Sequence, residues 1–105
     1  MLESQFQSRL VKKLEDMFDG CIILKNDSGN RQGIPDLIIL HGDRWAALEV
    51  KKSTTAAHRP NQDWYIRNLD AMSFAAFIYP ENEKDILNAL QQAFRARRTT
   101  RVSQR

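Results

Sequence analysis

Residues 33–51 read GIPDLIILHGDRWAALEVK and hold two β-rich runs, Ile34–His41 and Arg44–Lys51, on either side of Gly42-Asp43. A glycine-containing dipeptide between two such runs is typical of the two-residue primed turn of a β-hairpin. This turn pairs the last residue of the first run with the first residue of the second, and the register then extends along both strands. The sequence therefore predicts which side chains lie opposite one another.

The predicted register places two acids, Asp36 and Glu49, opposite each other with their Cβ atoms roughly 5 Å apart on one face of the sheet. Like charges at this separation repel, and a fold keeps such a pair most readily when a cation lies between them. Carboxylate oxygens are hard ligands that favour Mg²⁺ or Mn²⁺. Lys51 follows Glu49 by two residues and points to the same face.

Three observations near the acids bear on this interpretation. An Asp followed at some distance by Glu-X-Lys is a pattern that often occurs by chance. The informative observation is that here the Asp and the Glu-X-Lys fall on two adjacent predicted strands. Gly33 is expected to leave room for a close phosphate approach. The alternative for Glu49 and Lys51 is an exposed edge strand whose charges resist aggregation, although an Asp at position 36 would then be an unneeded acid in a strand.

Length and composition favour one soluble domain with one modest core. The chain has 105 residues, of which 42% are hydrophobic and 28% charged, which are ordinary globular values. A single cysteine, Cys21, excludes an internal disulfide framework, and no His or Cys cluster has zinc-ligand spacing. Residues 1–13 carry charges every few residues, and no run of 18 apolar residues occurs. We therefore expect a cytoplasmic protein without a membrane partner.

Periodicity outside the hairpin predicts three helices and two further strands. The helices are expected around Leu2–Met17, Pro60–Met72 and Asn82–Phe94, and the strands at Cys21–Lys25 and Phe74–Tyr79. Asn82 is a suitable N-cap for the third helix. The complete order is therefore helix, three strands, helix, strand, helix.

The second helix carries a polar residue on its apolar stripe. Pro60 suits the first helical position, and the stripe that follows consists of Gln62, Tyr65, Ile66, Leu69 and Met72. A glutamine is unexpected there unless it has a hydrogen-bonding partner. The aromatic residues Trp45, Trp64 and Tyr65 could stack on bases, but aromatics at such spacing are more often core.

The C-terminal end is strongly basic. Residues 95–105 contain Arg95, Arg97, Arg98, Arg101 and Arg105 and no acid, so they contribute +5, whereas the rest of the chain carries −2. Clustered arginine in a chain with a pI near 9.3 favours contact with a phosphate backbone. The alternative is a solvated, solubilising end.

The residues Gly33-Ile34-Pro35-Asp36 and Glu49-Val50-Lys51, in an α-β-β-β-α-β order, resemble the PD-(D/E)XK nuclease superfamily. The small size, Gln62 and the stretch Lys25-Asn26-Asp27 resemble the VRR-NUC (virus-type replication-repair nuclease) family, especially its stand-alone phage members. The similarity covers about residues 1–95 as one nuclease domain and leaves residues 96–105 as a basic tail without a counterpart. It implies an α/β, restriction-endonuclease-like core, a mixed sheet flanked by helices, with an added C-terminal helix.

The resemblance also implies roles for individual residues. The implied ligands of a Mg²⁺ or Mn²⁺ ion are Asp36, Glu49, Glu3 and the main-chain carbonyl of Val50. Lys51 would position or activate the attacking water, and Gln62 would support the site. No organic cofactor is implied. Simpler explanations remain for two of these residues: Glu3 suits the dipole of a first helical turn, and Gln62 suits a capping contact.

Basic residues near the predicted site and in the tail are candidates for nucleic-acid contacts. The candidates are Lys25, Arg31, His58, Arg59, Arg95, Arg97, Arg98 and Arg101. His58 and Arg59 lie in the loop after Lys51, where a merely solvated loop is equally expected. His41 belongs to the turn-closing pair on the face opposite Asp36 and is not a candidate base.

The function expected from these features is metal-dependent endonucleolytic cleavage of DNA, selective for structure because no base-reading helix is recognisable. A homodimer presenting two sites is expected, since a small domain has little surface for gripping a branched duplex. The alternatives are a non-catalytic nucleic-acid-binding module, an assembly protein without metal affinity, and a sequence-specific or RNA-cleaving nuclease.

Overall fold

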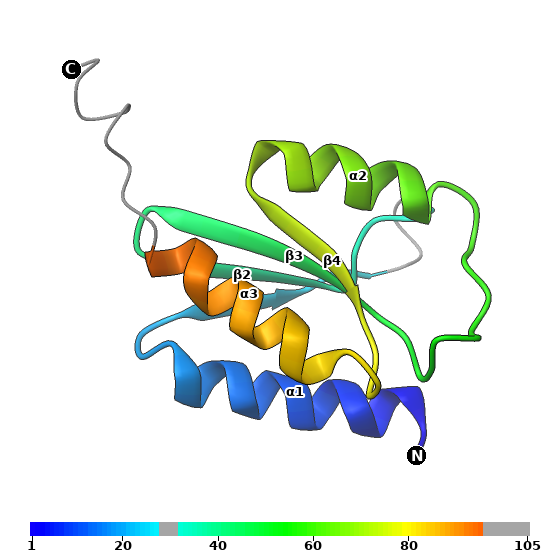
Figure 1. Cartoon of the computed structure of the whole chain (residues 1–105), viewed down its shortest axis with the longest axis horizontal. Helices are drawn as coiled ribbons and strands as arrows, with labels where there is room; N and C mark the ends of the chain where they lie inside the picture. Colours follow the sequence, from blue (N-terminus) through cyan, green and yellow to red (C-terminus); the bar gives the residue numbers. More distant parts are fainter. Residues whose placement is uncertain (28–31, 96–105) are drawn as a thin grey trace.

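Four strands form one mixed sheet between helices in the computed structural model of the chain (Figure 1), which describes residues 1–27 and 32–95. The elements are α1 (Glu3–Met17), β1 (Ile22–Lys25), β2 (Leu37–His41), β3 (Arg44–Val50), α2 (Gln62–Met72), β4 (Phe74–Ile78) and α3 (Glu83–Arg95). The predicted order is confirmed. No helix in these two ranges has the length and apolar character needed to cross a membrane.

The hairpin has the predicted register. Pairing of β2 with β3 is antiparallel and runs from His41 opposite Arg44 to Leu37 opposite Leu48. Gly42 supplies the positive φ, +65°, that the turn requires. The ladder stops at Leu37, so Asp36 lies one residue beyond it, and the predicted strand start at Ile34 was three residues too early.

The sheet order is β1-β2-β3-β4, and β3 and β4 are parallel. β3 is therefore an internal strand, which rules out the exposed edge strand as an explanation of its charges. The helix α2 crosses between the two parallel strands, as a parallel connection requires.

Successive residues of each strand point to opposite faces of the sheet. Leu37 and Ile39 are fully buried and pack in one core with apolar residues of α1 and α3, among them Leu10 and Leu90. These two helices lie on one side of the sheet and α2 on the other (Figure 1). The even-numbered residues of β2 point to the α2 side, and Asp36 continues their direction at the start of the strand. Each fully buried aliphatic side chain contributes about 1.5–3 kcal/mol.

The start of α2 differs from the prediction. The helix begins at Gln62 rather than Pro60, because Asn61 adopts a left-handed conformation with φ 72°. A Cβ added to Gly33 would lie 2.7 Å from Asn61 Cβ and 2.8 Å from the Pro60 carbonyl oxygen. Gly33 is therefore needed for this backbone packing, which is a structural reason for the glycine that does not involve phosphate, and Gly33 also lies at the pocket described below.

Three apolar residues are more exposed than predicted. Met72 is 74% and Trp64 is 54% accessible, and α2 packs mainly against β3 and β4. Trp64 follows Gln62 by two residues, about 200° around the helix, and so points away from the sheet. Leu2 precedes α1 and is also exposed.

Candidate functional site

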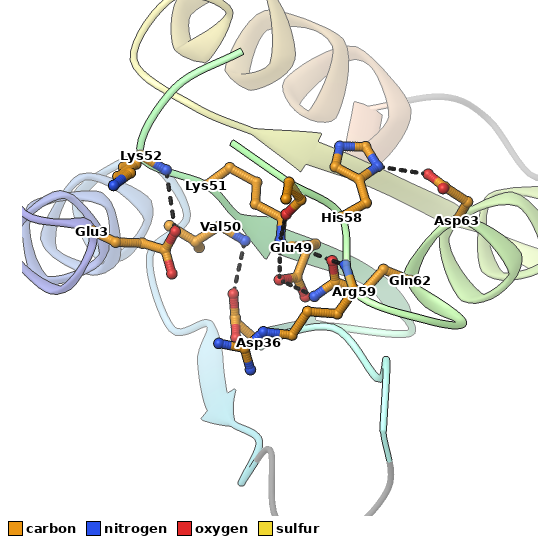
Figure 2. Close-up of polar contacts among 11 residues, drawn as sticks. Glu3, Asp36, Glu49, Val50, Lys51, Lys52, His58, Arg59, Gln62 and Asp63 are labelled. Atoms are coloured by element: carbon orange, nitrogen blue, oxygen red, sulfur yellow. Dashed lines mark hydrogen bonds and ion pairs between the residues drawn. The ribbon is translucent and has the colours of Figure 1, made fainter. Parts of the chain in front are cut away.

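The predicted site residues converge at the C-terminal end of β3 (Figure 2). Glu49 and Val50 end this strand, and Lys51 follows directly. Asp36 comes from the residue before β2, and Gln62 from the first turn of α2. Residues far apart in the chain thus meet at one edge of the sheet, on the face that α2 covers.

Asp36 is held by contacts to two neighbouring strands. Its Oδ2 accepts a hydrogen bond from the Val50 main-chain N–H at 2.9 Å. Its carbonyl oxygen accepts the Asn26 N–H at 2.8 Å, while the Asn26 side chain donates to the Pro35 carbonyl at 2.7 Å. The carboxylate is therefore fixed against the end of β3, where a ladder bond would otherwise form.

Glu49 is buried, with 4% of its surface accessible. Its Oε2 accepts a hydrogen bond from Gln62 Nε2 at 2.9 Å and lies 3.8 Å from Lys51 Nζ. Its Oε1 is buried and has no hydrogen-bond partner among the described residues. Burial, with the negative charge of Asp36 adding to it and the Lys51 ammonium opposing it, raises the pKa of Glu49 to about 8.

Lys51 is 6% accessible and its ammonium is surrounded by oxygens. Nζ donates to Gln62 Oε1 at 2.8 Å and to the Ala57 carbonyl at 3.1 Å, and it forms the ion pair with Glu49. An ammonium has three N–H donors. All three therefore have an acceptor or an anionic neighbour inside the site.

Gln62 connects the acid to the lysine. Its amide oxygen accepts from Lys51 Nζ and, at 2.8 Å, from the Arg59 main-chain N–H, while its amide nitrogen donates to Glu49. The bond to Arg59 ties Gln62 to the loop before the N-cap residue Asn61 and is not a cap of α2. These bonds explain why a polar side chain on the apolar stripe of α2 is only 5% accessible.

Glu3 lies at the pocket wall but is not brought against the other two acids. Its Oε1 accepts the Lys52 main-chain N–H at 3.2 Å, which ties the first turn of α1 to the chain after β3 (Figure 2). Across residues 1–27 and 32–95, no group of three or more His, Cys, Asp or Glu side chains is placed to hold a metal ion. The structure thus groups Asp36, Glu49, Lys51 and Gln62, with Glu3 beside them.

A pocket of about 480 Å³ opens over these residues. Its charged lining consists of the acids Glu3, Asp36 and Glu49 and the bases Lys51, Lys52 and Arg59. Three positive charges thus accompany three acids, which suits a ligand that carries both a cation and an anionic group.

The candidates for nucleic-acid contacts are scattered. Arg59 lines the pocket. The His58 ring lies 4.1 Å from that of Phe77 in a stacked arrangement, and its Nδ1 is 2.8 Å from Asp63 Oδ1, outside the pocket lining. Lys25 ends β1 without lining the pocket, and Arg95 ends α3. Arg31, Arg97, Arg98 and Arg101 lie outside the described residues.

His41 lies away from the site, as the sequence predicted. Its Nε2 is 3.1 Å from the Asp19 carbonyl oxygen, and its ring packs against Phe18 and Phe94. Sequence reasoning missed the Ala57 carbonyl and the Arg59 main-chain N–H as partners of the site. Both depend on the conformation of the loop before α2, for which the sequence offers no periodic signal.

Comparisons of this chain with protein-family models, curated proteins and solved structures give no match. Function is therefore inferred from the geometry and chemistry of the site itself.

Proposed function

We propose that this chain is a divalent-metal-dependent endonuclease that hydrolyses DNA phosphodiester bonds, built on a PD-(D/E)XK nuclease core of the VRR-NUC type. The observation that carries the proposal is the buried acid pair whose Glu49 Oε1 has no hydrogen-bond partner among the described residues, next to the Lys51 ammonium. A buried carboxylate oxygen without a partner needs a proton or a cation.

The donor set fits Mg²⁺ or Mn²⁺. Asp36, Glu49 and the main-chain carbonyl of Val50 would hold the ion, and Glu3 lines the same pocket. Bound there, a divalent ion would polarise a phosphoryl oxygen and lower the pKa of a water molecule. Burial, reinforced by the negative charge of Asp36, raises the pKa of Glu49, and the repulsion between the two acids favours occupation by a cation.

The remaining site residues would orient the reacting groups. Lys51 holds a positive charge beside Glu49, where it would stabilise an anionic nucleophile or the negative charge that develops on the phosphoryl group. Gln62 fixes the positions of both side chains through its two amide atoms. These hydrogen bonds lie within the protein itself, so they would orient both side chains for the reaction.

We infer a structure-selective enzyme that acts as a homodimer. Ile22 and Leu24 on the edge strand β1 are exposed on the side away from α1 and α3, and an apolar edge strand of this kind favours pairing with a second chain. Two sites related by two-fold symmetry would match a duplex or junction.

The deciding experiment is cleavage of linear, flapped, four-way and RNA substrates with Mg²⁺ or Mn²⁺. We expect cleavage of branched DNA that is lost in Asp36→Asn. Asp43→Asn is the matched control, because it removes an acid from the turn at the other end of the same hairpin. No metal-dependent cleavage of any substrate, at protein concentrations that saturate binding, would reject the enzyme.

One observation favours a second candidate, a nucleic-acid-binding module without catalysis. The described residues include no group of three ligating side chains, and two carboxylates bind a divalent ion more weakly than three. This candidate predicts DNA binding that is the same in Asp36→Asn and in the unaltered protein, without cleavage by either.

A further inference from the structure

Three cationic side chains line the pocket, and one of them, Lys51, is already bonded to oxygen atoms of the protein. The Lys51 ammonium is surrounded by Gln62 Oε1, the Ala57 carbonyl and Glu49. To bind an additional anion, Lys51 would have to release one of these partners. A phosphate that enters the pocket therefore needs another cation.

The main chain of Arg59 is fixed directly beside the acids. Its N–H donates to Gln62 Oε1 at 2.8 Å, and its carbonyl accepts the Gln62 N–H at 3.2 Å. The following Pro60 has a restricted φ, and Asn61 packs against Gly33. The side-chain amide of Gln62, which donates to Glu49, thus also fixes the main chain of Arg59.

The side chain of Arg59, by contrast, is available. It is exposed, and no ion pair involves it within residues 1–27 and 32–95. Figure 2 shows it extending from the loop towards Asp36 across the pocket. An arginine fork binds phosphate oxygens in a bidentate manner, which the point charge of the exposed Lys52 cannot do.

We infer that Arg59 binds a phosphate group of the DNA strand at the mouth of the pocket and so holds a phosphodiester beside Asp36 and Glu49. The inference rests on the proposed function, since it assigns a substrate contact to that same site. Arg59 is the substrate-anchoring residue, whereas Lys51 acts on the chemical step.

The first test is binding of a fluorescent DNA oligonucleotide to Arg59→Ala, Arg59→Lys and Arg67→Ala, measured with Ca²⁺ in place of Mg²⁺. Arg67 is an exposed arginine on α2 outside the pocket lining, so it is the matched control. We expect a loss of affinity of roughly 10- to 100-fold in Arg59→Ala, partial retention in Arg59→Lys, and no change in Arg67→Ala. The slope of log K against log salt should fall by about 0.9 in Arg59→Ala.

The second test replaces single phosphates of the oligonucleotide with neutral methylphosphonates. At one position the substitution should weaken binding of the unaltered protein but not of Arg59→Ala, because the variant no longer binds that phosphate. Unchanged affinity and salt slope in Arg59→Ala, or additive effects at every position, would overturn the inference. If one phosphate position affects binding of the unaltered protein but not of Arg59→Ala, and the DNA is never cleaved, the Arg59 contact is supported and the nuclease activity is rejected. If no DNA binds, both proposals are rejected.

Discussion

Glu49 keeps a negative charge only at a cost, because its carboxylate is buried beside Asp36. Either a proton or a cation can remove this cost, and the two compete for the same oxygens. Since burial and the neighbouring acid raise the pKa of Glu49 to about 8, the proton occupies the site at neutral pH when no metal is present. This competition makes both stability and metal affinity dependent on pH.

We expect the free energy of unfolding of the metal-free protein to fall as the pH rises from about 4.5 to about 8. Over this range Glu49 is protonated in the folded protein and ionised in the unfolded chain, so the folded state binds the additional proton and loses stability as protons are removed. Urea unfolding at pH 5 and pH 8 measures the difference. Glu49→Gln should lose this part of the pH dependence; the same dependence in the variant would contradict the assignment.

Divalent metal should raise the melting temperature of the protein. An ion at 100 times its dissociation constant stabilises by about 2.7 kcal/mol, and the effect should grow from pH 6 to pH 8 as the competing proton leaves. Asp36→Asn should abolish the shift while keeping an oxygen to accept the Val50 N–H, whereas Asp43→Asn should keep it. Thermal denaturation with and without Mn²⁺ tests this, and an unchanged shift in Asp36→Asn would falsify the metal site.

Replacing Lys51 with methionine should reduce turnover by about 10²- to 10³-fold, because the positive charge acts on the transition state. The variant should also unfold more easily at high pH, since Glu49 loses its compensating cation. Lys84→Met is the control, because Lys84 is an exposed lysine on α3 outside the pocket lining. Single-turnover cleavage and circular dichroism separate the two effects. Cleavage by Lys51→Met at the unaltered rate would exclude a catalytic role.

Among the site residues, those of the hairpin were predictable and those of the following loop were not. The register of β2 and β3 brings Asp36 close to Glu49, and strand alternation alone puts Lys51 on the same side. The partners of Lys51 come from Ala57 and Gln62, whose positions depend on the folded loop. A local pattern cannot report contacts that arise only in the tertiary structure.

At the scale of elements, the start of α2 shows how one backbone contact overrides a local preference. Proline at the first helical position is favourable, yet the helix begins at Gln62 because Asn61 turns left-handed where it meets Gly33. The periodicity of α2 correctly predicts that Gln62 is buried. Met72 belongs to the same stripe but is the last residue of α2, and it is exposed.

Gly33→Ala should destabilise the protein more than Gly42→Ala. Both glycines have positive φ, which costs about 1 kcal/mol or more for alanine, but a Cβ at Gly42 meets nothing within 4 Å, whereas one at Gly33 would clash with main-chain and Cβ atoms. We expect an additional loss of about 1–3 kcal/mol at Gly33. Urea unfolding of the two variants measures it; equal losses would show that the loop moves aside freely.

At the scale of the whole molecule, the net positive charge depends on the C-terminal residues. Residues 96–105 contain four arginines and no acid, so without them the net charge changes from +3 to −1. With a net charge near zero, the rest of the chain would not attract DNA at long range. The sequence alone predicted this asymmetry, since it needs no structure.

Truncation after Arg95 should weaken DNA binding without changing the chemical step. The Michaelis constant should rise, and single-turnover cleavage at saturating DNA should stay nearly constant. The salt slope should fall by up to about 0.9 for each phosphate that the shortened chain no longer binds. Cleavage and binding at several salt concentrations test this. A full salt slope in the truncated protein would mean that these arginines do not contact DNA, and loss of folding would assign them to the core or a dimer.

The hydrogen bond from the Val50 N–H to Asp36 makes one main-chain amide a spectroscopic reporter of the site. Amides in the middle of β3 bond to carbonyls of the neighbouring strands, so their nuclear magnetic resonance frequencies depend on the sheet. The frequency of the Val50 amide depends instead on the electron density of a carboxylate. Any ligand that withdraws electrons from this carboxylate would shift the Val50 amide resonance, and occupancy could be followed in solution without a substrate.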